Sequence, residues 1–501
     1  MTNLKKETKA VAKHSSVYML ATILNRVVSF LMIPIYTRFL LPSDYGIMEI
    51  LGLTTDVIGM VISLGIAGAM YRFYFEYDSS KDRNEVISTA ILTFGVIALV
   101  SLLALSSSSH YLSIKVLKTD KYYYYFLIAF CSLWFNTILQ MGYTYLRIRE
   151  ESVRYLWYSL SRMILALSLN IYLVAILKIG VLGVLLSTLI TSITFSLLLV
   201  LPIILKVGAR FSSDKCKAMV KYGAPLIPTN IAAFVVHASD RFFINHYVGL
   251  AQTGLYSLGY KFGNLPNNFI AAPFMQIWEV RFFKRFREKD AHIIFGKIFT
   301  YLCFLTIFTG LGISVLIKDA LKIMSDPAYW SAYKIVPIIL ISYIIFSFQY
   351  YFNMGIYITK KTKYLAYINI SNAILNICLN FILISRYGVW GAAFATLSCF
   401  IYKVLITYTI SNRLYRIKFE TLRLLKLAGL ALVLYFCCSF ISIGTVYTDL
   451  AVKFVVACTF PILLFFIGFY TDGEKAAILK AIRQPKLALA SIMGKEAPGA
   501  A

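Results

Sequence analysis

Positively charged and amide side chains stand inside stretches of sequence that are otherwise hydrophobic. Asn25 and Arg26 lie near the middle of the run SVYMLATILNRVVSFLMIPIYTRFL, residues 16–40. An arginine at the centre of a membrane helix costs roughly 2.5–3.5 kcal/mol on insertion scales, so it needs a polar environment. Arginine binds phosphate oxygens through paired hydrogen bonds, and lysine binds them as a point charge. These residues predict a binding site for an anion within a membrane protein.

Other candidate ligands of the anion lie on polar faces of expected helices. Ser257, Lys261 and Asn264 recur at i, i+4 and i+7 within residues 252–279, a spacing that places them on one helix face. Asp240 and Arg241 stand together near the end of the preceding hydrophobic stretch. A water-filled cavity with excess positive charge accounts for these residues together. The predicted substrate ligands are Arg26, Asn25, Arg162, Lys261, Asn264 and Arg241.

Three carboxylates in or near the hydrophobic stretches are candidates for coupling to protons or sodium ions. These are Asp56, Glu49 and Asp240. The alternative is structural, because Asp56 or Glu49 would also neutralise Arg26 or Lys261 as a buried ion pair. Asn and Ser stripes likewise serve as hydrogen-bonding contacts between membrane helices. One such stripe comprises Asn369, Asn372, Asn376 and Asn380.

The cysteines and acidic residues give no pattern for a metal, a cofactor or a catalytic centre. None of the eight cysteines forms a CxxC pair, so we expect buried packing residues and no metal or cofactor. No DxD sequence occurs for a metal-bound sugar nucleotide, and no long loop could house a catalytic centre. The chain is therefore not expected to be an enzyme.

The elements that must position these residues are membrane-spanning helices. Of the 501 residues, 59% are hydrophobic and 14% are charged, and the mean hydropathy is +0.74. A soluble protein carries about a quarter of its residues as charges. The long uncharged runs are continuous and do not alternate, which favours helices of roughly 20 residues over a barrel. Fourteen spans are expected, near 15–40, 45–71, 86–109, 122–146, 154–177, 180–205, 220–245, 252–279, 296–317, 335–358, 364–385, 388–411, 424–446 and 452–470.

The formal net charge of +26 is explained by the positions of the basic residues. Lysines and arginines concentrate in the N-terminal segment, the even-numbered loops and the C-terminal segment. This distribution predicts a multi-pass protein of the cytoplasmic membrane with both termini in the cytoplasm. The expected partners of the basic surplus are anionic lipids, and no nucleic acid is needed.

An internal similarity divides the chain into two halves. The segment IGVLGVLLSTL at 179–189 matches YGVWGAAFATL at 387–397, with five identities in eleven positions. At the same offset the turn FLLPSDYG, residues 39–46, falls on YVGLAQTG, residues 247–254, where only the glycine is shared. The predicted organisation is an N-terminal six-helix lobe at 1–210, a second six-helix lobe at 211–418, a helix pair at 419–470 and a cytoplasmic tail at 471–501.

Two sequence motifs resemble those of the polysaccharide flippase family, within the multidrug/oligosaccharidyl-lipid/polysaccharide superfamily. NRVVSFLMIPIYTRFLLPSDYGIMEI, residues 25–50, carries an arginine inside the first helix and a Pro-x-Asp-Tyr-Gly turn into the second. SDRFFINHYVGLAQTGLYSLGYK, residues 239–261, resembles the family's Asp-Arg-aromatic segment and Gly-x-Tyr start of the eighth helix.

The resemblance implies a V-shaped pair of six-helix lobes that moves an undecaprenyl-pyrophosphate-linked oligosaccharide across the membrane by alternating access. The substrate would be a repeat unit of O-antigen, capsule or another surface polysaccharide. In related lipid II flippases, basic cavity residues receive the diphosphate, and Arg26 matches an arginine at the corresponding position of the first helix. Two alternatives remain, a multidrug cation antiporter of the same superfamily and a membrane glycosyltransferase or polymerase.

Overall fold

A computed structural model describes residues 2–63 and 65–483, and this part of the chain is built from helices without a strand. The expectation of an all-α polytopic membrane protein is confirmed. The helices are α1 (Thr2–Leu31), α2 (Ile33–Phe39), α3 (Pro42–Ile62), α4 (Ile66–Glu76), α5 (Ser80–Ser107), α6 (Ser109–Leu117), α7 (Tyr123–Ile148), α8 (Ser152–Asn170), α9 (Val181–Val207), α10 (Ser213–Gly223), α11 (Ile227–Tyr247), α12 (Leu250–Gly263), α13 (Ala272–Arg285), α14 (Ala291–Met324), α15 (Val336–Ile358), α16 (Lys363–Leu414), α17 (Thr421–Ser439), α18 (Val446–Cys458), α19 (Phe460–Phe466) and α20 (Asp472–Arg483).

The expected number of fourteen spans is not confirmed. Within residues 2–63 and 65–483, 11 helices are long and apolar enough to cross a membrane, or 12 if the bent pair α10 and α11 is one span. Two expected spans run together in α16, which is 52 residues long and bends at Gly388, where φ is 55°. The expected span 252–279 is divided into α12 and α13 by Pro266 and the π-helical turn Asn267–Ala271. Sequence patterns locate the apolar runs. The bend at Gly388 and the π-helical turn decide how many separate helices those runs form.

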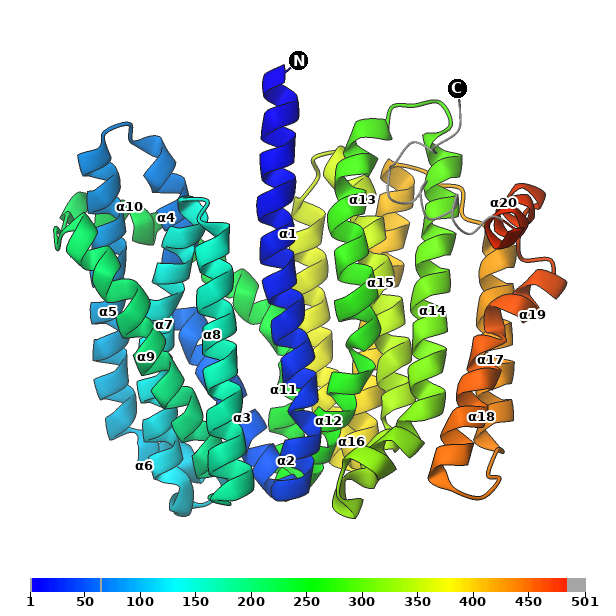
Figure 1. Ribbon diagram of the computed structural model, residues 1–501, viewed down its shortest axis with the longest axis horizontal. Helices are drawn as coiled ribbons and strands as arrows, with labels where there is room; N and C mark the ends of the chain where they lie inside the picture. Colours follow the sequence, from blue (N-terminus) through cyan, green and yellow to red (C-terminus); the bar gives the residue numbers. More distant parts are fainter. Residues whose placement is uncertain (1, 64, 484–501) are drawn as a thin grey trace. The chain divides into compact units, whose positions relative to one another are not determined.

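The chain forms two compact units, which are interleaved in sequence. The first contains Met1–Lys261, Met324–Ile335 and Lys363–Tyr402, and the second contains Phe262–Ile323, Val336–Thr362 and Lys403–Ala501. In the first unit α7 packs against both α5 and α9, and Figure 1 shows α8 beside α9. Buried aliphatic and aromatic side chains of α4, α5, α7 and α9 form its main core. A helix that satisfies its own backbone hydrogen bonds needs only apolar contacts to pack in a bilayer.

The motif between α2 and α3 has a local structural explanation. Pro42 opens α3, where a residue without an N–H leaves no hydrogen bond unmade. The Leu41 amide donates to the Asp44 carboxylate at 3.1 Å, which caps the helix. Tyr45 is buried, and its hydroxyl accepts a hydrogen bond from Lys261 at 2.8 Å. The turn therefore starts α3 and also places the Tyr45 hydroxyl where it accepts a hydrogen bond from Lys261.

Gly46 allows α3 and α12 to approach until their backbones touch. A Cβ at Gly46 would overlap the Leu250 carbonyl, and one at Gly254 would overlap the Pro42 carbonyl. Gly46 and Gly254 are aligned with each other when residues 39–46 are matched to residues 247–254. The contact therefore joins equivalent positions of the two expected halves. Two small residues at a helix crossing permit such an approach.

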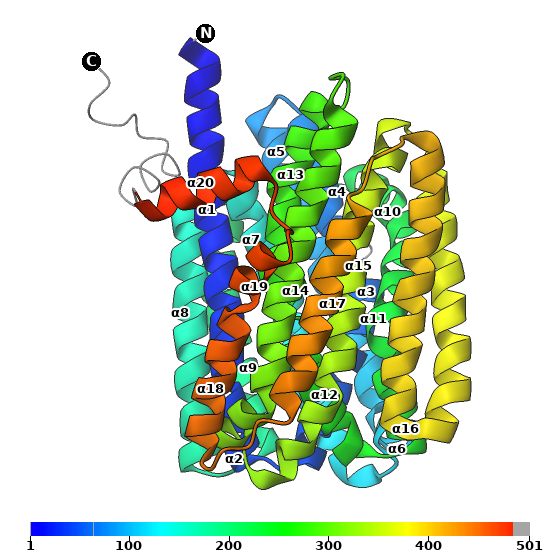
Figure 2. The same ribbon diagram turned by 90° about the vertical axis from the view of Figure 1, so that its right-hand side faces the viewer.

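The second unit is stabilised by aromatic packing and by a buried ion pair. Trp278, Phe282 and Phe295 stack or meet edge to face, with centroid distances of 4.1–6.1 Å. Lys453 of α18 donates to the Asp319 carboxylate of α14 at 2.5 Å, and both side chains are buried. Figure 2 shows α17 and α18 side by side. The ion pair therefore fixes the trailing helices to α14.

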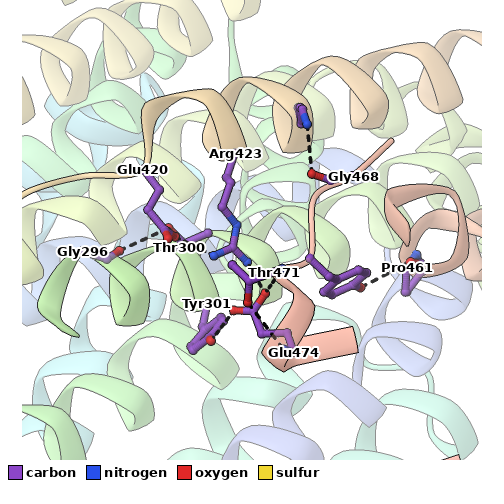
Figure 3. Close-up of polar contacts among 11 residues, drawn as sticks. Gly296, Thr300, Tyr301, Glu420, Arg423, Pro461, Gly468, Thr471 and Glu474 are labelled. Atoms are coloured by element: carbon purple, nitrogen blue, oxygen red, sulfur yellow. Dashed lines mark hydrogen bonds and ion pairs between the residues drawn. The ribbon is translucent and has the colours of Figure 1, made fainter. Parts of the chain in front are cut away.

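Helix α20, at the start of the expected tail, is anchored by charged side chains. Arg423 of α17 donates to Glu474 of α20 and to Glu420, each at 2.8 Å. The Tyr301 hydroxyl of α14 donates to the other Glu474 oxygen at 2.5 Å (Figure 3). Figure 2 shows α20 lying crosswise to α17 and α18. Residues 472–483 of the expected tail are thus held against this unit.

Candidate functional site

A cavity of about 490 Å³ lies within the first unit, among α1, α2, α7, α8 and the end of α12. Along α8 its lining extends from Tyr155 to Asn170, which is about 22 Å at the helical rise of 1.5 Å per residue. The lining residues are Asn25, Val28, Ser29, Met32, Tyr36, Gln140, Tyr143, Tyr155, Ser159, Arg162, Met163, Ala166, Leu167, Asn170 and Lys261.

Two cations line this cavity. Arg162 is half-buried, and its guanidinium donates to the Asn136 side-chain oxygen at 2.5 Å. The Lys261 ammonium donates to the Tyr45 hydroxyl at 2.8 Å, and half of its side chain is exposed. Both hydrogen bonds are to neutral oxygens, and the Glu49 carboxylate lies 3.9 Å from the Lys261 ammonium, beyond a short hydrogen bond. Each therefore keeps donors for an anion in the cavity.

Hydrogen bonds between helices hold the polar wall in place. Asn25 of α1 donates to the Ser159 hydroxyl of α8 at 2.9 Å. The Tyr36 hydroxyl of α2 donates to the Asn170 side-chain oxygen at 3.0 Å, and the Asn170 amide donates to Ser187 at 2.8 Å. Because these bonds cross between helices, they fix the spacing of α1, α2 and α8 around the cavity.

The charge of the lining is entirely positive. Among the described residues that line the cavity, Arg162 and Lys261 are charged, and no aspartate or glutamate is present. Charges in such a partly enclosed space interact more strongly than charges in bulk water. The arrangement attracts an anion and opposes the binding of a cation.

The sequence-predicted ligands divide into those at the cavity and those elsewhere. The structure brings together Asn25, Arg162 and Lys261 on the cavity wall. Arg26, the next residue of α1, is half-buried and is not one of the described lining residues. Asn264 belongs to the second unit, where its side-chain oxygen accepts a hydrogen bond from Asn267 at 3.1 Å.

Arg241 is held in a buried network in α11 and α12. Its guanidinium donates to the adjacent Asp240 carboxylate at 2.7 Å and lies 3.6 Å from the centre of the Tyr260 ring. The other Asp240 oxygen accepts from the Tyr256 hydroxyl at 2.6 Å. Only 4% of Arg241 and 2% of Asp240 are exposed. Arg241 and Asp240 therefore form a buried structural ion pair and not a ligand-binding site.

Glu49 and Asp56 differ from Asp240 in their surroundings. Glu49 lies between two cations, 4.0 Å from the Arg241 guanidinium and 3.9 Å from the Lys261 ammonium. These distances are at the limit of an ion pair, and neither is a short hydrogen bond. Asp56, two turns further along α3, is exposed. Both carboxylates therefore remain candidates for ion binding.

The cavity also contains residues that were not predicted as ligands. Tyr36, Tyr143 and Tyr155 line it, although aromatic residues in a membrane helix usually indicate packing. Helical spacing supplied a signal, because Tyr155 lies seven residues before Arg162 and Tyr143 lies seven after Asn136. Residues i and i+7 share a helix face.

The Asn stripe of α16 serves as a hydrogen-bonding contact. The Ser239 hydroxyl of α11 donates to the Asn376 side-chain oxygen at 2.9 Å, and the Asn380 amide donates to the same oxygen at 3.0 Å. Within the described part of the chain, no group of three or more His, Cys, Asp or Glu residues is placed to hold a metal ion.

Comparison with known sequences finds a family that part of the chain resembles. Residues 35–282 match the family described as "Polysaccharide biosynthesis protein". The match includes the turn at 41–46 and the segment 239–261, so the family resemblance inferred from the motifs is confirmed. No curated protein sequence matches the chain significantly.

Solved structures share the fold at low sequence identity. Lipid II flippase MurJ in an inward closed conformation matches with a TM-score of 0.73 and 15% identity, over 90% of this chain and 99% of that chain. A multidrug resistance MATE family transporter in an inward-facing conformation matches with a TM-score of 0.60 and 13% identity, over 81% of this chain and 96% of that chain. The proteins of these two solved structures are described as a flippase and a transporter.

Proposed function

We propose that the chain is a flippase for a lipid-linked oligosaccharide diphosphate, translocated across the cytoplasmic membrane by alternating access. The observation that carries the proposal is the cavity, whose described lining residues include two cations and no aspartate or glutamate. A bare diphosphate cannot enter hydrocarbon, because burying unpaired charge costs many kcal/mol. Arg162 and Lys261 give the diphosphate a polar route, while a polyprenyl tail remains in the lipid.

The binding roles follow from the geometry of the wall. Arg162 binds phosphate oxygens through its planar guanidinium, and Lys261 provides a second charge that can move on a flexible stem. Asn25 orients the wall through its bond to Ser159. Arg26 adds positive potential from the adjacent position of α1. Outward movement of negative charge is favoured by an inside-negative membrane potential, about 2.3 kcal/mol per charge per 100 mV.

Glu49 and Asp56 are better candidates for ion coupling than Asp240. Asp240 already accepts short hydrogen bonds from Arg241 and Tyr256. Protonation of Glu49 would remove the carboxylate 3.9 Å from Lys261 and strengthen the attraction of Lys261 for an anion. A proton or a sodium ion at these residues would thereby be linked to substrate binding.

The alternative of a multidrug cation antiporter fits the fold and disagrees with the cavity. An organic cation is bound by acidic or aromatic groups, and although three tyrosines line the cavity, its charged lining residues described above are both positive. The repulsion between like charges in a low-dielectric site works against such a substrate. The anion substrate is therefore the better match.

The test is transport of a fluorescent polyprenyl-diphosphate sugar in proteoliposomes. Arg162→Ala and Lys261→Ala should each lower the transport rate about tenfold or more, since a hydrogen bond to a charged group contributes about 1.5–3 kcal/mol. Arg162→Lys should restore part of the rate, because it keeps the charge and loses the planar fork.

Arg154→Ala is the matched control. Arg154 lies on the same helix α8, but 70% of its side chain is exposed and it pairs with Glu151 at 2.8 Å. The control should transport at the normal rate. Unchanged transport in both Arg162→Ala and Lys261→Ala would refute the proposed role of the cavity.

A further inference from the structure

Three tyrosines form a continuous aromatic group that begins on the cavity wall. Tyr143 of α7 and Tyr155 of α8 line the cavity, with ring centroids 5.1 Å apart. Tyr18 of α1 meets Tyr155 edge to face, also at 5.1 Å. Tyr71 of α4 is close enough to Tyr18 and Tyr155 for an electrostatic interaction. Three helices of the first unit thus contribute a ring to the group, and α4 places a fourth tyrosine near it.

The group has a cation at each end. Arg162 lies next to the Tyr143 hydroxyl inside the cavity. At the other end, the Arg147 guanidinium is 5.8 Å from the centre of the Tyr71 ring. Arginine and tyrosine together offer flat apolar faces and hydrogen-bond donors, which is the combination that suits a ligand with both apolar and hydroxyl surfaces.

One hydroxyl of this group is buried without a partner. The Tyr18 oxygen is inaccessible and makes no hydrogen bond to any described residue. A buried hydroxyl without a hydrogen bond costs about 1–3 kcal/mol, so it is either a packing defect or a donor that a ligand reaches when the Tyr155 side chain moves. Its ring touches Tyr155, which places it one side chain behind the cavity wall.

We propose that Tyr18, Tyr143 and Tyr155 form a saccharide subsite next to a diphosphate subsite at Arg162. The inference rests on the proposed function and specifies which part of the substrate each side of the cavity receives. In a lipid-linked oligosaccharide the first sugar is bonded directly to the diphosphate. The subsite for this sugar must therefore adjoin the cation that binds phosphate, as Tyr143 adjoins Arg162.

The chemistry of a pyranose matches this wall. Its C–H face packs against an aromatic ring, as apolar groups do in general, and its hydroxyls need hydrogen-bond partners around the edge. Tyr155 supplies a face beside the largely buried Tyr143 ring, Gln140 and Ser159 supply polar atoms on the same wall, and the Tyr18 hydroxyl lies behind Tyr155. The tyrosines therefore determine preference for the sugar, and Arg162 binds any diphosphate.

The experiment compares two probes on the purified full-length chain in detergent. One probe is a short-chain polyprenyl diphosphate, and the other is the same lipid carrying one N-acetylhexosamine. The wild-type chain should bind the glycosylated lipid more tightly. Tyr155→Ala should weaken binding of the glycosylated lipid roughly 5- to 10-fold and leave the bare diphosphate unchanged. Arg162→Ala should weaken both.

Tyr18→Phe and Tyr172→Ala make the comparison specific. Tyr18→Phe keeps the packed ring and removes only the unpartnered hydroxyl, so it should weaken only the glycosylated probe, by a few-fold. Tyr172 lies beyond the end of α8, is half exposed and does not line the cavity, so Tyr172→Ala should bind both probes normally.

Two outcomes overturn different statements. If the bare diphosphate fails to bind the wild-type chain, the proposed function is wrong. If it binds, but the sugar adds no affinity or Tyr155→Ala weakens both probes equally, only the saccharide subsite is wrong. A Tyr18→Phe chain that binds the glycosylated lipid as well as the wild type would assign the orphan hydroxyl to packing.

Discussion

At the residue scale, the same kind of side chain has different uses according to its nearest neighbours. Arg162 and Lys261 donate hydrogen bonds to neutral oxygens beside open space, with Glu49 3.9 Å from Lys261, whereas Arg241 is enclosed and donates to a carboxylate at 2.7 Å. Sequence position alone does not separate these cases, since all three lie within hydrophobic stretches. Burial and the charge of the first contact separate a ligand from a structural ion pair.

Asp240→Asn should destabilise the protein strongly. Removing one charge of a buried pair leaves Arg241 uncompensated, which costs about 3–5 kcal/mol. The measurement is thermal unfolding of the purified protein in detergent. Asp56→Asn is the matched control, because Asp56 is exposed, and its midpoint should stay close to that of the wild type. Equal midpoints for all three proteins would contradict the structural role of Asp240.

The sequence predicted a polar, positively charged site, but it predicted only some of the residues that line the cavity. Arg162, Lys261 and Asn25 were identified from charge and helical spacing and line the cavity. The tyrosines were missed, because hydropathy cannot distinguish an aromatic ring on a cavity wall from one in a core. Asn25 and Arg26 point about 100° apart on an ideal helix, so the phase of α1 against α8 decides which of them lines the wall.

At the element scale, the crossing of α3 and α12 leaves no space for a side chain. Gly46→Ala or Gly254→Ala would place a methyl group against a backbone carbonyl of the other helix. Overpacking of this kind typically costs about 1–3 kcal/mol, and backbone cannot move aside as a side chain can. We expect a lower thermal midpoint for both variants.

Gly52→Ala on the same helix α3 is the control for the crossing. A Cβ at Gly52 would meet nothing within 4 Å. Alanine is also a better helix former than glycine by roughly 0.8–1.0 kcal/mol. The midpoint of Gly52→Ala should therefore be unchanged or higher. A fall as large as that of Gly46→Ala would show that the crossing is not the cause.

Attachment of α20 should depend on pH through Glu474. Burial raises the pKa of this carboxyl, and hydrogen bonds from Tyr301, the Thr471 amide and Arg423 lower it more, so its pKa lies below the ordinary 4.5. A lowered pKa contributes stability above about pH 4.5 and loses it as the pH falls through the folded-state pKa.

The measurement is hydrogen exchange of the α20 amides as the pH is lowered from neutral, corrected for the intrinsic exchange rate. Protection should fall below about pH 4.5 in the wild type. Glu474→Gln should show weaker protection at neutral pH and no such transition. A transition that persists in Glu474→Gln would assign the pH dependence to another group.

At the scale of the whole molecule, hydrophobic runs predicted an all-helical membrane protein correctly, and the number of spans was less predictable. Apolar length fixes that a segment crosses the bilayer. It does not fix whether two crossings share one bent helix, as in α16, or whether a π-helical turn divides one crossing into short pieces. These choices depend on single backbone angles and prolines that hydropathy does not register.

The proposed topology is testable by cysteine labelling in cells. In a cysteine-free background, Ser80→Cys lies at the first residue of α5 and should react only with reagents that reach the cytoplasm. Ser107→Cys at the other end of α5 should react from outside. Both expectations follow from the basic residues around the even-numbered loops. Reaction of Ser80→Cys from outside would invert the topology and the proposed direction of transport.

The contact of Gly46 with Gly254 has a mechanical consequence for α3 and α12. Two backbones that touch without intervening side chains can pivot about the crossing, because rotation keeps both glycines in register. Sliding by a single residue would drive a carbonyl oxygen into a Cβ, since the flanking Tyr45, Ile47, Thr253 and Leu255 all carry side chains. The crossing therefore allows α3 and α12 to tilt against each other and opposes sliding of one helix along the other.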